Sequence, residues 1–413
     1  MQNALKTILL FTLFFVFFGC ERKSNNKNSF VLSKNQRVSV FDLFSEVDAI
    51  QLETLENCLV SNVSSIVIYD ARIYFVDRNN QKVFCFSEEG DFLFQVSRQG
   101  NGQGEYNWVS DITIDTDRKR LALLDAPSQR VLFFDLYGNY LETLYIFSEV
   151  SLGLNQVSLL SDSLLLFTGL YENDFILYCL KTSAIIERFG GIGEYPPSIF
   201  LPIRHKYSFN NDWFVTPTLG NTTYKVSGSS FVPHFTWCFG KDNNTGEQVE
   251  KLKENFKRWQ SASLSPIYPY IVGKGRFLNN MILSTFETVR YRAACLEFDG
   301  NFKNVVVDKK TGQNYVFDNF LEGLIFSPRN ICNGYHYHSS LDFRYDVIKN
   351  SIESGRWYLL GGVEMKPYDL DFYFNRNHTF YTRDILTERG KEVYDNHDPM
   401  HDNPYLVIFR FKE

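Results

Sequence analysis

Two neighbouring stretches of the chain repeat each other without a gap at an offset of 48 residues. Residues 73–96, IYFVDRNNQKVFCFSEEGDFLFQV, align with residues 121–144, LALLDAPSQRVLFFDLYGNYLETL. Asp77 meets Asp125, and the apolar positions coincide along both stretches. A copied unit of this length restricts the fold to architectures that stack or circle one small supersecondary element.

Each unit reads as four short strands joined by polar or glycine-bearing turns. Gly90 and Gly138 occupy equivalent positions and supply the backbone freedom that the third turn needs. An aromatic content of 16% favours β structure over helix. Four strands in about 48 residues are typical of a β-propeller blade, because radial repetition removes long unpaired sheet edges.

Later units are more degenerate but keep the strand pairs. We expect them at residues 163–189, 213–239 and 281–307, the last with Gly300 at the same turn as Gly90, and a sixth unit assembled from residues 325–390 and both chain ends. The strand NPYLVIFRF, residues 403–411, is expected to pair with an early strand such as residues 48–54 and to close the ring. The sequence therefore predicts an all-β, six-bladed β-propeller of four-stranded antiparallel blades over residues 37–413. Residues 247–260, EQVEKLKENFKRWQ, space apolar side chains at helical intervals and predict a short helical insertion.

The N-terminus, MQNALKTILLFTLFFVFFGC, reads as a secretory signal over residues 1–19. Its apolar run covers residues 7–18, which is short against the ~20 residues that a spanning helix needs. Phe-Phe-Gly-Cys resembles a bacterial lipobox, with Cys20 as the lipidated residue; a simple export signal is the alternative. Residues 20–36 are polar and read as a flexible tether. We therefore expect an outer-membrane lipoprotein held to the membrane by lipid, with the membrane face left open.

Charge and cysteine usage exclude some classes of function. The net charge is -6 with interspersed signs, so there is no basic stripe for nucleic acid. The six cysteines besides Cys20 are scattered without a CxxC pair, which argues against zinc or thioredoxin-like redox sites. Most lie in apolar strand-like runs, so buried free thiols are favoured, and disulfides stay open for an exported protein.

A glycine-rich loop, RQGNGQGEYNW, follows the fourth strand of the first unit at residues 98–108. A phosphate-binding reading fails, because a strand rather than a helix follows the glycines and no Walker motif is completed. Part of the loop recurs as RFGGIGEY at residues 188–195, again after a fourth strand. The loop therefore belongs to the connection from the outer strand of one blade to the inner strand of the next.

The combination of a lipoprotein signal, the Arg-x-Gly-x-Gly-x-Gly-Glu-Tyr loop and a C-terminal Asn-Pro strand resembles a known family. This family is the six-bladed β-propeller lipoproteins of Bacteroides-type bacteria, which are similar to NHL-repeat propellers. The resemblance is close over residues 48–146 and looser afterwards, and Gln103 stands where the family usually has proline. It implies the blade count and an envelope location, but no chemistry.

In a four-stranded meander the second turn and the connection to the next blade lie at the same end of the blade. Polar side chains of these segments should therefore ring one mouth of the central channel and form a funnel suited to sugars or peptides. The candidate funnel residues are Asp77, Arg78, Arg98, Glu105, Tyr106, Trp108, Asp125, Arg188, Glu194 and Tyr195. The alternative for the Glu-Tyr pairs is a structural role in tying neighbouring blades together.

Histidines offer only weak metal candidates. His336 and His338 alternate on one expected strand, and His397 and His401 fall in HDPMHD, but solvated histidines explain both patterns. DNNTG at residues 242–246 lacks the spacing of a calcium loop, and no Ser/His/Asp set can be assigned. We therefore expect no catalytic residue, metal or cofactor.

The leading hypothesis is a monomeric binding or scaffold module for a glycan, peptide or envelope protein at the channel mouth. The alternative is a propeller lyase or hydrolase with its active site in the central channel, which needs titratable groups converging on the axis. A sensor or scaffold within an envelope complex would instead expose a large apolar patch.

Overall fold

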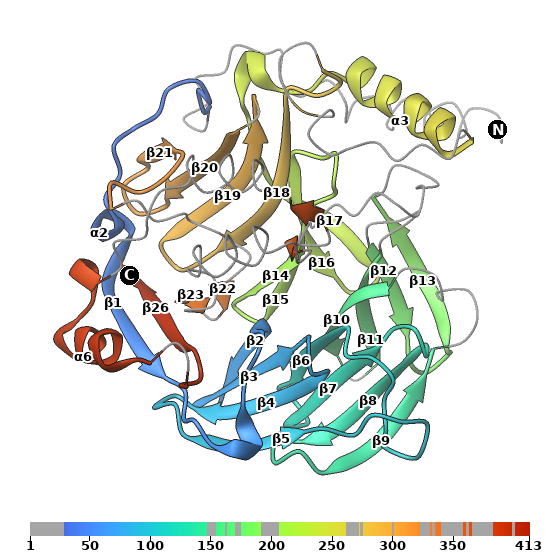
Figure 1. Ribbon diagram of the computed structural model, residues 1–413. Coiled ribbons are helices and arrows are strands. Elements are labelled where there is room, and N and C mark those ends of the chain that lie inside the picture. Colours follow the sequence, from blue (N-terminus) through green and yellow to red (C-terminus); the bar gives the residue numbers. More distant parts are fainter. Residues whose placement is uncertain are drawn as a thin grey trace.

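The structure is a computed structural model with its sheets arranged in a ring (Figure 1). It describes residues 29–146, 154–161, 163–169, 175–190, 206–261, 272, 276–299, 301–322, 331–332, 335–339, 358–360, 363–365, 383–398 and 401–413. Cys20 lies outside these residues, as do Glu194 and Tyr195.

Five sheets are antiparallel meanders of four consecutive strands, ordered from the innermost strand to the outermost. The first holds β2 (Ser64–Tyr69), β3 (Arg72–Asp77), β4 (Lys82–Ser87) and β5 (Phe92–Val96). The second holds β6 (Asp111–Asp115), β7 (Arg120–Asp125), β8 (Arg130–Asp135) and β9 (Tyr140–Tyr145), and the third β10 (Leu154–Ser161), β11 (Leu164–Gly169), β12 (Phe175–Cys179) and β13 (Ala184–Phe189). The fourth holds β14 (Lys206–Phe209), β15 (Asp212–Val215), β16 (Thr222–Ser227) and β17 (Ser230–Thr236), and the fifth β18 (Asn280–Glu287), β19 (Tyr291–Phe298), β20 (Asn301–Asp308) and β21 (Asn314–Phe317).

The remaining strands form a composite sheet and one small sheet. The composite sheet has the order β1 (Phe44–Gln51), β26 (Tyr405–Phe411), β23 (Tyr335–Ser339) and β22 (Ile331–Cys332), and the small sheet pairs β24 (Tyr358–Leu360) with β25 (Val363–Met365). The helices are α2 (Val40–Leu43), α3 (Gly246–Ser261) and α6 (Glu388–Asn396), with 3-10 turns η1 (Glu56–Cys58), η2 (Gly240–Asp242) and η6 (Arg383–Ile385). The helical insertion expected at residues 247–260 is confirmed as α3.

The repeat defines the first two blades as expected. Strands β7 and β8 begin and end 48 residues after β3 and β4. Gly90 and Gly138 both have a positive φ, at 100° and 83°, in the turn before the outermost strand. The fifth blade differs by one hairpin from the prediction, because the turn that pairs Phe298 with Asn301 joins the second strand to the third.

The predicted count of six blades requires a correction, because the described meanders of consecutive strands number five. The composite sheet is not such a meander, because its four strands come from three separate stretches of the chain: β1, β22 with β23, and β26. The predicted pairing of the C-terminal strand with an early strand is confirmed, since Asp48 of β1 lies opposite Ile408 of β26.

The core lies between adjacent sheets, where apolar side chains of neighbouring blades pack against each other. Leu406 of β26 packs in one cluster with Phe75 and Phe84 of the first blade. On the other side of the composite sheet, the rings of Phe411 and Phe286 lie 5.4 Å apart. The composite sheet thus fills the gap between the fifth blade and the first (Figure 1).

Part of the expected tether is packed against the blades. Residues 29–36 belong to the segment for which the sequence predicted flexibility, yet Phe30 and Leu32 are buried. The Phe30 ring lies 5.9 Å from that of Trp237, and the Gln36 amide donates to the Val316 carbonyl at 2.7 Å. Among the described residues, no helix is both long and apolar enough to cross a bilayer.

Candidate functional site

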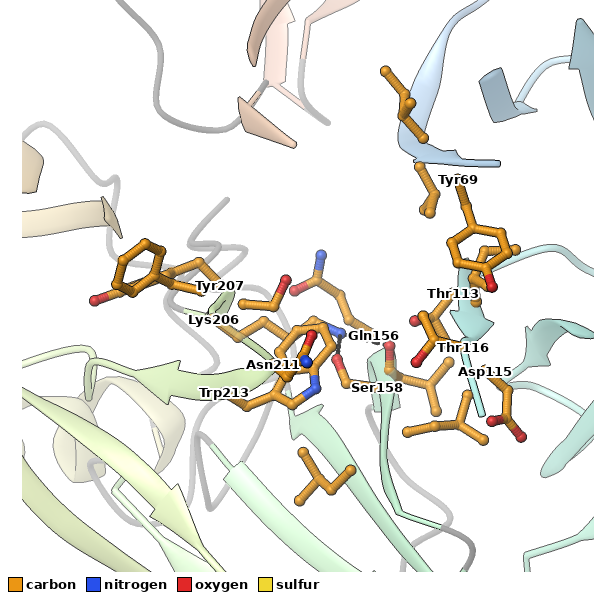
Figure 2. A pocket seen from close by; sticks show the side chains of 18 of the residues that line it. Tyr69, Thr113, Asp115, Thr116, Gln156, Ser158, Lys206, Tyr207, Asn211 and Trp213 are labelled. Atoms are coloured by element: carbon orange, nitrogen blue, oxygen red, sulfur yellow. Dashed lines mark hydrogen bonds between the residues drawn. The ribbon is translucent and has the colours of Figure 1, made fainter. Parts of the chain in front are cut away.

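A cavity of about 680 Å³ lies on the axis of the ring. Its walls are the inner strands β2, β6, β10, β14 and β18, and the turns that follow β6, β14 and β18 add further residues. Figure 2 shows side chains from several blades directed toward this space.

The topology explains why this cavity is polar. Each of these five strands stands at the end of its sheet and hydrogen-bonds to one neighbouring strand only. The inner strands of adjacent blades adjoin each other, as β6 does with β2 and β10. Their other edges therefore face the axis and add backbone donors and acceptors to the polar side chains there.

A buried ion pair joins three of the inner strands. The Lys206 ammonium of β14 donates to the Val157 carbonyl at 2.6 Å and to the Ser158 hydroxyl at 2.7 Å, both on β10. It also lies 3.6 Å from a carboxylate oxygen of Asp111 on β6, whose side chain is 7% exposed. That carboxylate accepts a hydrogen bond from the Val157 amide at 3.1 Å. The two opposite charges compensate each other within the wall.

A second carboxylate, Glu287 at the end of β18, is surrounded by cationic groups. It accepts hydrogen bonds from Arg292 at 2.8 Å and Lys309 at 2.9 Å, and the His234 ring lies 2.9 Å away. Burial alone raises the pKa of Glu287, but hydrogen bonds from Arg292 and Lys309 outweigh it and lower the pKa to about 2. Glu287 is therefore ionised at neutral pH and joins the fourth and fifth blades.

Gln156 of β10 differs from these residues, because one polar atom of its side chain is unsatisfied among the described residues. The residue is 6% exposed, and its side-chain oxygen has no hydrogen-bond partner within the described chain. In Figure 2 its amide reaches toward the middle of the cavity. Buried amides are normally satisfied, so this group marks a place where a ligand or water completes the site.

Aromatic side chains complete the lining. Trp213 of β15 contacts the cavity beneath Lys206, whose ammonium lies 5.7 Å from the indole centroid. Tyr207 stacks on Phe214 at 5.1 Å and donates a long hydrogen bond of 3.4 Å to Glu287. Tyr69 borders the cavity at the end of β2.

The predicted funnel residue Tyr106 is buried in the structure. Its hydroxyl donates to the Gln81 carbonyl at 2.7 Å and to the Val96 carbonyl at 3.0 Å, and burial raises its pKa to about 12. Glu105 accepts a hydrogen bond from the Gly102 amide at 2.7 Å and so closes the glycine loop on itself. For this copy of the loop the geometry matches the alternative role of joining blades.

Two further funnel candidates, Asp77 and Asp125, are fully buried. Asp77 accepts a hydrogen bond from the Ser61 amide at 2.8 Å. Asp125 accepts one from the Asn107 amide at 2.9 Å and lies 3.1 Å from Arg130. These carboxylates hold turns and the glycine loop together, which supports the expectation that both segments share one end of the ring.

The remaining described funnel candidates, three arginines and Trp108, differ in their exposure and in their distance from the axis. Arg78 donates to the Ser64 hydroxyl at 3.1 Å and to the Ser110 carbonyl at 3.3 Å, across the first two blades. Trp108 is 45% exposed and Arg98 is exposed. Arg188 lies on the outermost strand β13, away from the axis.

No described funnel residue borders the central cavity. The turn residues that do border it all follow the inner strands, among them Asp117, Asn211 and Val289. That end of the ring is opposite to the glycine loop. A ligand-binding role for the funnel residues stays a prediction.

The described histidines and cysteines form no metal site. His397 lies 3.0 Å from the Gln51 side-chain oxygen, and His401 lies 2.7 Å from Asp398. Among the described residues, no group of three His, Cys, Asp or Glu side chains is placed to hold a metal ion. His336 and His338 are on β23, but their side chains lie outside the described part.

Five cysteines whose side chains the structure describes form no disulfide with one another, as the sequence favoured. Their residues are Cys58, Cys85, Cys179, Cys238 and Cys295, of which all but Cys179 are buried.

The sequence missed the residues that line the cavity. Asp111 carries no motif, and Gln156 and Lys206 precede the stretches, residues 163–189 and 213–239, that the sequence assigned to the third and fourth units. The signal that would have found them is position, since each lies on the first strand of its blade.

Comparisons with known proteins give a family and a fold. The family described as "Domain of unknown function (DUF4934)" matches residues 26–410. The chain is similar to the solved structure of a "putative exported protein" from Bacteroides fragilis, with 18% identity, a TM-score of 0.65, and coverage of 93% of this chain and 100% of the other. It is also similar to a member of the DUF4221 family from Bacteroides vulgatus, with 12% identity, a TM-score of 0.45, and coverage of 92% and 99%. No curated protein matches.

Proposed function

This chain belongs to the DUF4934 family, whose function is unknown, and from its central cavity we propose that it is a propeller module that binds an uncharged polar ligand on its axis without converting it. The cavity volume of about 680 Å³ falls in the range of ~300–1,000 Å³ typical of small-molecule sites.

The observation that carries this proposal is that the buried carboxylates of the wall are paired, including Asp115 with Arg120 at 2.8 Å, whereas Asp117 lies at the exposed mouth. Asp111 is compensated by Lys206, and Glu287 is held by Arg292, Lys309 and His234. A general acid or base works best with a pKa near the working pH, and Glu287, with a pKa of about 2, is far from it. These pairings count against the alternative of a lyase or hydrolase in the channel.

We further propose that the composite sheet serves as the sixth blade. Its four strands pack against the fifth blade on one side and the first on the other. Because β1 and β26 come from opposite ends of the described chain, their pairing joins the two ends into one sheet.

We place the protein in the cell envelope as an outer-membrane lipoprotein that carries lipid on Cys20 and acts as a monomer. The signal-like N-terminus supports export. The similarity to a protein described as exported agrees with this location.

The exposed Arg98 and Trp108 are proposed as a second contact for a larger glycan, peptide or envelope protein at the opposite mouth. Alanine at both positions should abolish capture of such a partner from envelope extracts. Retained capture would remove this second contact from the proposal.

The cavity proposal is tested by narrowing its open end. Val289 is 70% exposed and borders the cavity, so Val289→Trp places a bulky side chain there, and Asp117→Trp does the same from another blade. Leu93→Trp, on the outermost strand β5, is the matched control.

Panels of neutral glycans and short peptides are titrated calorimetrically against the purified full chain. We expect at least one ligand whose affinity falls tenfold or more in both mouth variants and is unchanged in the control. Affinities that both mouth variants preserve would place binding elsewhere and overturn the proposal, as would the absence of binding throughout. Turnover of a bound ligand would favour the enzyme.

A further inference from the structure

The Gln156 amide presents an unusual recognition element inside the cavity. Its oxygen is buried without a partner in the described chain, although the residue lies on a rigid inner strand between β6 and β14. A side-chain amide offers an acceptor and two donors side by side in one plane. Such a group pairs with a ligand that carries a donor and an acceptor on adjacent atoms, as two neighbouring hydroxyls do.

The charge balance around this amide argues against a charged ligand. Lys206 and Asp111 flank Gln156 from the neighbouring inner strands and already compensate each other. A ligand with its own charge would upset this pair or remain uncompensated in a buried place, which is unfavourable. The site therefore suits a neutral molecule.

The wall also carries hydroxyl-bearing and aromatic side chains. Thr113 and Ser158 come from the second and third blades, and Trp213 and Tyr69 provide ring surfaces. Hydroxyl and amide groups satisfy the hydroxyls of a sugar, while aromatic rings cover its apolar C–H faces.

From these features we infer that the axial ligand is an uncharged carbohydrate, held through adjacent hydroxyls by the Gln156 amide. This inference rests on the proposed binding function of the same cavity. A short oligosaccharide fits a compact space bounded by five inner strands, whereas an extended peptide would need a groove that lets both of its ends leave.

The experiment uses the full chain and neutral mono- and disaccharides as probes, each with its uronic acid counterpart. Binding is followed by saturation-transfer NMR and quantified by calorimetry. We expect neutral sugars to bind and the uronic acids to bind at least tenfold more weakly.

Gln156→Leu removes the hydrogen-bonding groups at similar volume and should weaken sugar binding at least tenfold. Gln95→Leu is the matched control, because the Gln95 side-chain oxygen is also buried without a partner in the described chain but lies on β5, outside the cavity. Should Gln156→Leu fail to fold, Gln156→Asn keeps the amide, withdraws it by one methylene and is expected to weaken binding in the same direction.

The outcomes separate this inference from the function on which it rests. If no sugar binds but neutral peptides bind and lose affinity in Val289→Trp, the inference of a carbohydrate ligand is wrong and the proposed binding function of the cavity stands. If sugars bind with the same affinity in the wild type, the Gln156 variants and Val289→Trp, both statements are overturned. Preferential binding of uronic acids would overturn the neutral-ligand inference alone.

Discussion

The Tyr106 hydroxyl donates a hydrogen bond of 2.7 Å to the backbone carbonyl of Gln81, in the second turn of the first blade. The Gln81 side chain in turn accepts a hydrogen bond from the Val109 amide at 2.7 Å, just before β6 begins. The glycine-rich loop thus links the first blade to the second through hydrogen bonds at Gln81. Its glycines let the chain fold tightly around the buried Tyr106 side chain.

Tyr106→Phe is predicted to destabilise the protein without altering its fold. The substitution leaves the Gln81 carbonyl with one partner fewer in a buried place, a loss of about 1–2 kcal/mol. Chemical denaturation checks this value. Tyr137→Phe, at a position 68% exposed, should change the free energy of unfolding by less than ~0.5 kcal/mol. Equal losses in the two variants would contradict the role of the loop in linking the two blades.

Gly104→Ala is predicted to be more harmful than the same change at Gly228. Both glycines have a positive φ, +75° and +57°. A Cβ at Gly104 would lie 2.7 Å from the Tyr140 ring on the next blade. A Cβ at Gly228 would have no atom of a described residue within 4 Å. We expect a loss of about 1 kcal/mol at Gly228 from backbone strain alone, and of about 2–4 kcal/mol at Gly104. Thermal unfolding of the two variants side by side makes the comparison.

The stability of the protein should depend on pH through Glu287. The folded-state pKa, about 2, is below the ordinary value of 4.5, so the unfolded chain binds a proton first as the pH falls. The stabilisation is complete above about pH 4.5 and is lost between there and about pH 2. It amounts to about 2 kcal/mol, after allowance for partial solvent screening at Lys309 and His234.

Denaturant unfolding at several pH values between 2 and 7 measures this loss. Glu287→Gln should be less stable than the wild type at neutral pH and should lose less stability on acidification. If the free energy of unfolding falls equally with decreasing pH in the two proteins, Glu287 does not contribute to the pH dependence of stability.

The contact between the composite sheet and the first blade should be sensitive to the shortening of buried side chains. Leu406 of β26 is fully buried and packs with Phe75 and Phe84. Leu406→Ala removes these contacts and is predicted to cost about 2–5 kcal/mol. Leu141→Ala, at a half-exposed position of the outermost strand β9, should cost less than ~1 kcal/mol. Similar unfolding midpoints would show that this contact carries little of the stability.

Alanine at both Arg98 and Trp108 is predicted to change stability little. Both residues are exposed in the glycine loop. The free energy of unfolding of the double variant should stay within about 0.5–1 kcal/mol of the wild type. A larger loss in thermal unfolding would indicate that these side chains, like Tyr106, hold the blades together.

The sequence predicted the fold better than the site, for a physical reason. Apolar alternation and turn residues repeat because every blade must bury both faces, so the offset of 48 residues placed β3, β4, β7 and β8 correctly. The blade count was less accessible, since the composite sheet has no repeat of its own and is assembled from strands that are distant in the chain.

The binding site could not be predicted from the sequence, because a polar residue that is buried and hydrogen-bonded within the protein looks the same in the sequence as one that binds a ligand. Asp77, Tyr106 and Asp125 look like ligand-binding groups in the sequence, yet each is buried and satisfied by neighbouring backbone or side-chain groups. Gln156 and Lys206 carry no motif, and only closure of the ring brings them to one cavity. The glycine loop was recognised correctly as a connection between blades.

The N-terminal segment has a mechanical consequence. Residues 29–36 run along the fourth and fifth blades through Phe30 and Gln36 before the chain reaches β1, the outermost strand of the composite sheet. Tension applied from the N-terminal side would first have to peel this segment from Trp237 and Val316. A pull from that side would therefore be resisted there before it reaches the pairing of β1 with β26.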